Sequence, residues 1–260
     1  MLNIIGGKMH YHPTILLMTA TITPPKNCPD LARVNPDLRM NDYYESLKYY
    51  LEIPSQLMDR IIFAENSDTD LTPLKEVLKF NSQNKKVEFI SFPNGNDFPP
   101  EYGKGYGEML LIDYALDNSK IINEDDIIWK ATGRLILSNL PSLIQKTPQN
   151  YDLYCDLHND YDFLGLVHFF DPRFYSFSLK GYDLYFRPHT NNLKKAHIEH
   201  YFYNVIKKDI YNNRIITRFK QVPLIKGFIG SSNQDYWSLN KKIQRKGQQI
   251  IRTIAPWFWL

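Results

Sequence analysis

The chain has 260 residues, of which 43% are hydrophobic, 23% charged and 14% aromatic. This is the composition of a globular protein, and it excludes a disordered or low-complexity chain. With 31 Lys and Arg against 28 Asp and Glu, the formal net charge of +3 is too small to indicate a nucleic-acid-binding protein. Two cysteines are too few for a disulfide framework, which fits a reducing compartment.

Predicted strands and helices alternate through the first half of the chain. Short apolar runs predict strands at 14–23, 60–64, 86–92 and 126–137. Apolar residues at helical spacing predict helices at 39–51, 71–80 (with Thr72 as its N-cap) and 107–118. This alternation predicts an α/β fold, a mostly parallel sheet flanked by helices, in which ligands bind beyond the carboxyl ends of the strands.

The second half is less regular and is rich in Tyr, Phe, Asp and His. We expect short strands and loops of an added lobe over 151–186, then a helix at 193–208, a basic strand at 215–222 and a loop at 225–233. No repeat or Ser/Gly-rich linker interrupts the chain. The sequence therefore predicts a single domain over residues 1–260.

Three glycines, Gly103, Gly105 and Gly107, surround Lys104 just before the third predicted helix. Glycines let a backbone approach a ligand closely, and N–H groups at a helix N-terminus attract phosphate. The spacing matches neither a Walker A motif nor a Rossmann fingerprint. An ordinary loop is the alternative interpretation.

Cationic residues alternate with small ones at the end of the fourth predicted strand. Lys130, Thr132 and Arg134 share one face of an extended chain, because Ala131 and Gly133 separate them. Lys and Arg together neutralise a diphosphate, and Arg binds it in a bidentate manner. The alternative is a charged strand end that pairs with nearby aspartates.

Carboxylates in the second half are candidates for metal binding or catalysis. Asp156, His158 and Asp160 share a face if extended and suit Mg²⁺ or Mn²⁺, or they are polar loop residues. Asp171 is an acceptor-site carboxylate or forms an Asx turn. Glu199, near a predicted helix start, suits a general base, or it lies on an ordinary surface face.

The segment 239–260 combines Lys and Arg with isoleucines and the run Pro256-Trp257-Phe258-Trp259-Leu260. Basic and apolar residues with indoles predict an interfacial helix on an anionic membrane. The alternative is a solvated terminal helix whose aromatic end docks on the domain. No cleavable leader pattern or membrane-spanning stretch is apparent, so we expect a cytoplasmic protein that is peripheral on the inner face of the cytoplasmic membrane.

Segments spread over the whole chain carry an ordered set of motifs. They are LLMTATITP (16–24), RMNDYYESLKYY (39–50), FAENSDTDL (63–71), GKGYGEMLLIDYAL (103–116), IIWKATGRLILSN (127–139), FDPRFYSFS (170–178), HIEHYFYNVI (197–206) and PLIKGFIGSSN (223–233). In this order they resemble bacterial nucleotide-sugar glycosyltransferases with a GT-A-like fold, of the type encoded for capsule and lipopolysaccharide O-antigen synthesis.

The resemblance implies a donor site and a catalytic site. Glu199 is the implied general base, with Asp156 and Asp171 as further catalytic candidates. The implied donor-binding residues are Thr19, Thr21, Glu65, Asn66, Ser67, Lys104, Gly105, Gly107, Glu108, Lys130, Thr132, Gly133 and Arg134. Residues 1–140 would form the nucleotide-sugar-binding half, 141–238 the acceptor-side half, and 239–260 the membrane-associating tail.

One departure from the family concerns the metal. Many of its members carry an Asp-x-Asp pair that holds a divalent cation on the diphosphate, whereas this chain has Ala131-Thr132-Gly133-Arg134 at the corresponding position. Arg134 or Lys130 would replace that cation electrostatically. We therefore expect no cofactor and metal independence, with Mg²⁺ or Mn²⁺ at Asp156 and Asp160 as the alternative.

The implied reaction is transfer of a hexose-type sugar to a hydroxyl of a lipid-linked or polysaccharide acceptor in surface-glycan synthesis, with inversion. Rings in 151–186 would stack on sugar faces. The alternatives are a nucleotidyltransferase or sugar-nucleotide-modifying enzyme and, less favoured, a single-stranded nucleic-acid-binding protein that uses the basic segment 214–220. The nearly balanced charge argues against a nucleic-acid partner.

Overall fold

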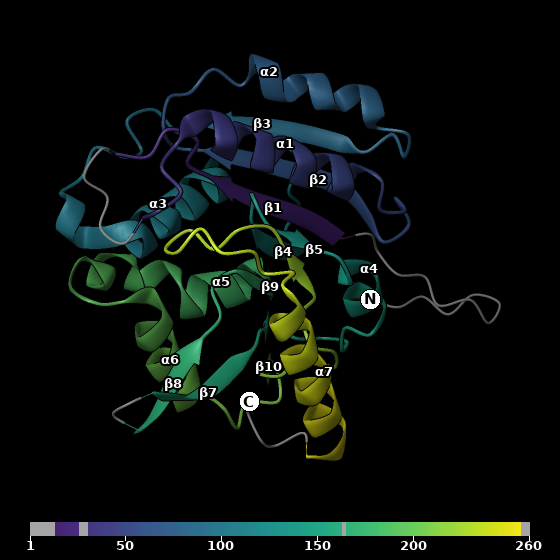
Figure 1. The fold of residues 1–260 in the computed structure, drawn as a ribbon, viewed down its shortest axis with the longest axis vertical. Helices are drawn as coiled ribbons and strands as arrows, with labels where there is room; N and C mark the ends of the chain where they lie inside the picture. The colour runs from purple at the N-terminus through teal and green to yellow at the C-terminus, as the bar shows by residue number, and fades with distance from the viewer. Residues whose placement is uncertain (1–13, 26–30, 163–164, 256–260) are drawn as a thin grey trace.

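A seven-stranded sheet with helices on both faces forms the protein (Figure 1). The structure, a computed structural model, describes residues 14–25, 31–162 and 165–255. The strand order is β10-β6-β9-β4-β1-β2-β3. The expected α/β class with a mostly parallel sheet is confirmed. In the described part of the chain no helix is long and apolar enough to cross a membrane.

Four parallel strands form the half of the sheet that the sequence predicts best. They are β1 (Thr14–Ala20), β2 (Met58–Glu65), β3 (Lys86–Ser91) and β4 (Ile127–Thr132). β1 pairs in parallel with β2 on one side and with β4 on the other. Because every residue of β1 is buried, its sequence is a continuous apolar run rather than an alternating one.

The alternation of side chains along β1 divides the core into two layers. Leu16 and Met18 pack in one cluster with Tyr43 and Leu47 of α1 (Pro36–Leu51). Ile15 and Leu17 pack in a second cluster, which contains residues of α3 (Gly103–Asn118). Since successive strand residues point to opposite faces, α1 and α3 cover opposite faces of the sheet.

The second half of the chain completes the same sheet. β9 (Phe174–Ser178) lies antiparallel between β4 and β6 (Leu153–Tyr154), and β10 (Ile215–Ile216) runs parallel to β6. The expected separate lobe over 151–186 is therefore wrong for β6 and β9. The aromatic composition of β9 leads to the expectation of a ring-lined lobe. Four of its five residues are instead buried in the core of the main sheet.

The remaining elements of the second half pack around this edge. They are β5 (Ile136–Leu137), α4 (Leu140–Gln145), β7 (Leu157–Asp162), β8 (Gly165–Phe170), α5 (Leu179–Tyr185), a 3₁₀ helix (Arg187–Lys195), α6 (Ile198–Lys208), β11 (Ile225–Lys226) and α7 (Leu239–Ile254). The expected helix at 193–208 is thus divided between the 3₁₀ helix and α6. The expected strand at 215–222 shrinks to the two residues of β10.

Helix starts differ from their predicted positions for local reasons. Asn35 Oδ1 accepts from the N–H groups of Asp37 and Leu38, so α1 begins at Pro36 rather than at residue 39. In the next helical region, Asp70 rather than Thr72 supplies the side-chain acceptor, because Asp70 Oδ1 accepts from Thr72 N. That region is a single turn, α2 (Thr72–Lys75), continued by a 3₁₀ helix at Glu76–Phe80.

The glycine-rich segment lies inside α3, which begins at Gly103 rather than at residue 107. Close packing accounts for two of its glycines. A Cβ at Gly105 would lie 2.7 Å from Cβ of Ile198, and a Cβ at Gly107 would lie 2.6 Å from the ring of Phe98. The small residues thus allow α3 to approach its neighbours.

The rings of the 151–186 region are core residues. Phe170, Tyr175, Phe177 and Tyr182 are each at most 1% exposed. They contact one another through tilted and edge-to-face pairs. The expectation that these rings stack on sugar faces is therefore wrong for the buried set, because a ligand cannot reach them.

Candidate functional site

The strand order reverses at β1, which places a topological switch point at the carboxyl ends of β1 and β4. We call this edge of the sheet the crevice. From β1 the chain continues outward through β2 and β3, then returns to the other side of β1 as β4 (Figure 1). Ligands of open α/β sheets bind where such a reversal separates the segments that follow two neighbouring strands. Thr19 of β1 lies opposite Thr132 of β4, so these two threonines mark the crevice.

Glu108, Lys130 and Thr19 form a hydrogen-bonded cluster at this crevice. Lys130 Nζ and Thr19 Oγ1 each donate to Glu108 Oε1, both at 2.7 Å. Glu108 belongs to α3 and keeps 22% of its side chain exposed. The cluster therefore presents to the crevice a carboxylate whose position two donors fix.

Lys130 supports this carboxylate from a fully buried position. Its Nζ donates to Glu108 Oε1 at 2.7 Å, to the Pro172 carbonyl at 2.6 Å and to Thr132 Oγ1 at 3.3 Å. Burial lowers the pKa of Lys130, and the charge of Glu108 opposes that effect. Because an ammonium group has three protons and these contacts number three, Lys130 supports Glu108 and Thr132 from below and has no further proton to donate.

Asp171 and Arg173 form a second charged pair at the same edge, where the antiparallel β9 begins. Arg173 Nε and Nη2 donate to the two carboxylate oxygens of Asp171, at 2.7 and 2.6 Å. Burial would raise the pKa of Asp171, but the charge and hydrogen bonds of Arg173 outweigh it and hold that pKa below its ordinary value. The side chain of Arg173 is 32% exposed, and its guanidinium group lies over the ring of Tyr236.

Glu65 connects the turns that follow β1 and β2. Its buried carboxylate accepts from Ile22 N at 3.1 Å and from Ser67 N at 2.9 Å, and also from the Ser67 hydroxyl. Both turns are therefore fixed by one side chain. The geometry gives Glu65 a positioning role beneath the site surface.

A row of hydrogen-bonded polar side chains lies above Glu65. Thr21 Oγ1 donates to Asn66 Oδ1 at 2.6 Å, and Thr23 N donates to Ser67 Oγ at 2.9 Å. Thr69 Oγ1 lies 2.9 Å from Thr23 Oγ1 and 3.0 Å from Ser67 Oγ. We call these five residues the hydroxyl rim. Asn66 is buried, whereas the other four residues are half-exposed or exposed and offer donors and acceptors for a base or ribose.

Two residues of α1 that the sequence analysis did not single out hold the hydroxyl rim in place. Arg39 Nε donates to the Thr21 carbonyl at 2.7 Å, and Arg39 Nη2 donates to the Tyr43 hydroxyl at 3.1 Å. That hydroxyl also accepts from Thr21 N at 3.0 Å. The sequence signal that could have identified them is the spacing of four residues between the arginine and the tyrosine, which places both on one face of the helix.

Gly133 continues the crevice beyond Thr132. Its N–H donates to the Thr19 carbonyl at 2.9 Å, and Ser46 Oγ donates to the Gly133 carbonyl. A Cβ at this position would lie 2.8 Å from the Thr19 carbonyl oxygen. Only glycine therefore allows the segment after β4 to follow β1 so closely.

The segment 227–233 closes over the same edge. Arg134 Nη1 donates to the Phe228 carbonyl, and the Gly230 carbonyl accepts from Arg33 N at 3.1 Å. Arg33 also donates to Asn233 Oδ1 at 2.7 Å. The structure thus uses the predicted diphosphate-binding Arg134 to hold a covering segment at the crevice.

Lys104 and Glu199 lie where two helices begin. Ile198 packs where a side chain at Gly105 would lie, so the first turns of α3 and α6 are neighbours. Lys104 is exposed and Glu199 is half-exposed. The structure therefore places side by side the two helix turns that carry these charged residues.

The Asp156 carboxylate is occupied by partners of its own, although the Asp156 carbonyl accepts from Asp171 N at 3.1 Å. This fully buried carboxylate accepts from Arg252 Nη1 at 2.9 Å and from Phe219 N at 2.6 Å. His158 Nε2 lies 3.7 Å from it. The Asp160 side chain lies outside the described residues, and among those described no group of three or more His, Cys, Asp and Glu is placed to hold a metal ion.

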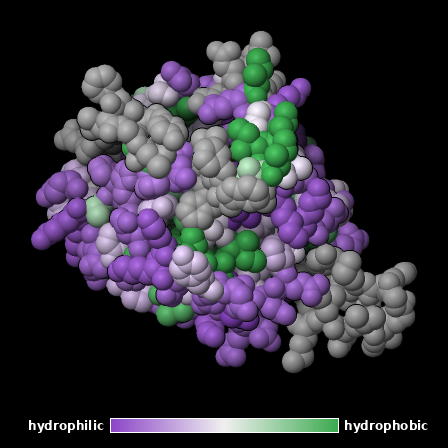
Figure 2. All heavy atoms as spheres, turned by 90° about the horizontal axis from the view of Figure 1, so that it is seen from below, coloured by the Kyte–Doolittle hydropathy of each residue, from purple (hydrophilic) through white to green (hydrophobic). Residues whose placement is uncertain are grey.

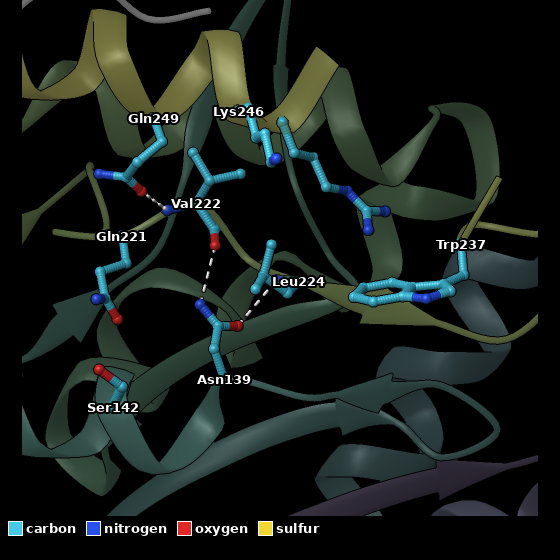
Figure 3. Close-up of a pocket in the computed structure, with 9 residues that line it drawn as sticks. Asn139, Ser142, Gln221, Val222, Leu224, Trp237, Lys246 and Gln249 are labelled. Atoms are coloured by element: carbon cyan, nitrogen blue, oxygen red, sulfur yellow. Dashed lines mark hydrogen bonds between the residues drawn. The ribbon is translucent and has the colours of Figure 1, made fainter. Parts of the chain in front are cut away.

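A cavity of about 510 Å³ lies between α7 and the segment before β11 (Figure 3). Asn139 anchors that segment, because its amide donates to the Val222 carbonyl at 3.0 Å and accepts from Leu224 N at 2.8 Å. The cavity is also lined by Ser142, Gln221, Trp237, Arg245, Lys246 and Gln249. The sequence analysis did not predict this cavity.

Comparison with known proteins gives distant structural likenesses only. No family model and no curated protein sequence matches the chain. HddC from Yersinia pseudotuberculosis has 13% identity and a TM-score of 0.44 over 90% of this chain and 99% of its own. An active-site mutant of LgtC has 8% identity and a TM-score of 0.46 over 79% of this chain and 72% of its own.

A third protein, from Desulfovibrio desulfuricans G20 and provisionally assigned as a nucleotide-diphospho-sugar transferase, has 13% identity and a TM-score of 0.40 over 92% of this chain and 97% of its own. Likenesses at this distance carry no functional argument.

Proposed function

We propose that the chain is a GT-A-like glycosyltransferase that takes a sugar from a nucleotide-sugar donor. The observation that carries the proposal is the polar crevice at the carboxyl ends of β1 and β4, where the strand order reverses. A hydroxyl rim on one side and a positioned carboxylate on the other suit a ligand that has both a nucleoside and a sugar.

In this proposal the donor lies across the strand ends. The nucleoside contacts the hydroxyl rim through the half-exposed Thr21 and Ser67, and the Glu108 carboxylate accepts hydrogen bonds from sugar hydroxyls. The partly exposed guanidinium groups of Arg134 and Arg173 lie at the same edge. They would stabilise the negative charge that develops on the leaving diphosphate.

The acceptor hydroxyl attacks the anomeric carbon as its proton passes to a carboxylate, and the nucleoside diphosphate leaves. Glu199, half-exposed beside the first turn of α3, is the proposed base. A single displacement of this kind inverts the anomeric centre. We extend the proposal to a lipid-linked or polysaccharide acceptor in surface-glycan synthesis, and to a reaction that needs no metal.

A thermal-shift panel of nucleoside diphosphates and nucleotide sugars tests the donor site. A ligand that binds only the folded chain raises the melting temperature by mass action. We expect Thr21→Val to abolish the shift and Thr253→Val, an exposed threonine of α7, to preserve it. No shift with any member of the panel contradicts the proposed donor site.

Mass spectrometry with and without a glycan acceptor tests the reaction. Transfer that depends on acceptor supports the transferase, whereas donor turnover alone favours a sugar-nucleotide-modifying enzyme. We expect Arg134→Ala to lower kcat on the order of 10²-fold, the effect of losing one charge-stabilising group. Activity that EDTA abolishes and Mn²⁺ restores contradicts metal independence.

A further inference from the structure

Helix α7 faces the domain with its polar side. Arg252 is only 5% exposed, and its Nη1 donates to Asp156 Oδ2 and to the Phe219 carbonyl, both at 2.9 Å. A buried ion pair of this kind fixes the rotation of a helix about its own axis, because turning the helix would leave the Asp156 carboxylate unpaired.

Two further polar contacts on α7 support the same orientation. Gln249 Oε1 accepts from Val222 N at 2.8 Å, as Figure 3 shows. Arg245 Nη1 donates to the Ile225 carbonyl at 2.9 Å. Residues 245, 249 and 252 recur at helical spacing, so they form one continuous inward face.

The opposite face of α7 is apolar and exposed. Ile243, Ile250 and Ile254 are 62%, 60% and 72% exposed. Spacings of seven and four residues place the three on one stripe of a helix. Gly247 lies within that stripe, and a Cβ there would meet nothing within 4 Å. Figure 2 shows hydrophobic side chains gathered over α7, with hydrophilic ones along part of their border.

This arrangement is the reverse of a surface helix on a water-soluble domain, which buries its apolar stripe and exposes its charges. Three exposed isoleucines at a regular spacing also differ from the single exposed apolar residues found on most surfaces. The outward face of α7 therefore has the properties of a docking surface.

Charge indicates what this surface contacts. Residues 236–260 contain no Asp or Glu and five Lys or Arg. Two of the five, Arg245 and Arg252, point inward, while the exposed Lys246 lies between the cavity of Figure 3, which it helps to line, and the isoleucine stripe. The side chains of Lys241 and Lys242 lie outside the described residues. A stripe of apolar side chains bordered by positive charge matches an anionic lipid surface.

The size of the stripe argues against a second copy of the chain as the occupant. A helix of 16 residues is about 24 Å long and about 10 Å wide, so one face covers on the order of 250 Å². A stable protein interface buries about 800 Å² on each partner. A bilayer needs no such area, since an interfacial helix binds with one face only.

We propose that α7 docks on an anionic membrane, with Ile243, Ile250 and Ile254 at the boundary between headgroups and acyl chains and Lys246 among the lipid phosphates. The ion pair between Arg252 and Asp156 sets the rotation that points the isoleucines outward. This inference does not rest on the transferase proposal, because lipid binding is measured without turnover.

Sedimentation of the full chain with vesicles tests the proposal. We expect binding to vesicles that contain phosphatidylglycerol and much weaker binding to pure phosphatidylcholine. Ile243→Ser and Ile250→Ser should each weaken binding by about tenfold, the effect of losing one buried aliphatic side chain. The matched control is Leu184→Ser on α5, whose leucine is 51% exposed, and it should bind as the parent does.

Three outcomes overturn the docking proposal. The first is that the isoleucine variants bind vesicles as tightly as the parent, and the second is an equal loss of binding in Leu184→Ser. The third is that the parent does not bind vesicles but forms a lipid-free dimer in sedimentation velocity, and that Ile250→Ser dissociates this dimer. The substituted side chains are exposed, so each variant should keep the melting temperature of the parent to within the scatter expected for surface changes.

Discussion

Gly133 shows at the scale of one residue how the crevice limits substitution. We expect Gly133→Ala to lower the free energy of unfolding by about 1–3 kcal/mol, because the added Cβ would overlap the Thr19 carbonyl and crowd the Tyr43 ring, 3.3 Å away. Urea denaturation measures the change.

The control is Gly247→Ala, in the middle of α7, where an added Cβ meets nothing within 4 Å. Alanine is the better helix former, so this variant should gain about 0.5–1 kcal/mol. If both alanine variants changed stability by the same amount, close packing would not explain Gly133.

His158 gives the protein a dependence on pH. Burial lowers its pKa below 6.5, although the charges of Asp156 and Asp171 oppose that effect. The unfolded chain therefore binds more protons than the folded chain below pH 6.5, and the free energy of unfolding should fall as the pH drops through that range.

His158→Gln removes this titration. We expect the loss of stability between about pH 7 and pH 5 to be smaller in the variant than in the parent, as measured by urea denaturation at both values. A matched comparison is His200→Gln, an exposed histidine on α6. Equal losses in the parent and in His158→Gln would show that other groups control the pH dependence.

Single residues were predictable where the strand pattern itself located them. Thr19, Thr132 and Glu65 follow or end buried apolar runs, and the structure places all three at the carboxyl edge. Lys130 was expected to contact a ligand, yet it is fully buried. Alternation along a strand gives the face of a side chain but not the depth of burial, which depends on Pro172, 42 residues later.

At the scale of elements, α7 depends on one buried ion pair. We expect Arg252→Gln to cost about 3–5 kcal/mol, because it leaves the Asp156 carboxylate buried without its charge partner. The double variant Asp156→Asn/Arg252→Gln should cost less than the sum of the two single changes. Urea denaturation of all four proteins gives the coupling energy.

An additive result from that cycle would mean that the two side chains do not stabilise each other. Limited proteolysis provides a second reading, since a loosened α7 should be cleaved faster in Arg252→Gln than in the parent. A comparison on another element is Arg187→Gln, at the start of the 3₁₀ helix, whose half-exposed arginine pairs with the exposed carboxylates of Asp117 and Asp183. Exposed pairs contribute little, so that change should be small.

The elements that matched prediction are those with a local cause. The runs that form β1 to β4 are apolar and long enough to read directly, and α1 has apolar side chains at helical spacing. The expected strand at 215–222 failed for a different reason. Only Ile215 and Ile216 find a partner strand, β6, while Phe219 N pairs with the Asp156 carboxylate. Partners so distant in sequence leave no local pattern.

At the scale of the whole molecule, the strand order predicts one cooperative unit. β9 from the second half of the chain pairs directly with β4 of the first half, and β6 joins the same sheet by pairing with β9. We expect a single unfolding transition, with coincident midpoints from far-ultraviolet circular dichroism and tryptophan fluorescence. Two separated midpoints would indicate that the two halves fold independently.

The α/β class followed from the alternation of elements, but the position of β9 did not. A strand that returns antiparallel beside β4 has the same composition as one in a separate lobe, and only pairing distinguishes them. The same pairing carries Asp171 and Arg173 to the carboxyl edge, because an antiparallel strand begins where its parallel neighbours end. The position of Asp171 and Arg173 in the candidate site therefore could not be predicted from the local sequence pattern.

The position of β9 also has a consequence for synthesis on the ribosome. When β4 has emerged, one of its edges pairs with β1, but its other edge must wait for residues 174–178. Until then the nascent chain presents an open strand of apolar residues, the kind of edge on which chains join one another. We therefore expect the chain to be most prone to association during the interval of about 40 residues between the two strands.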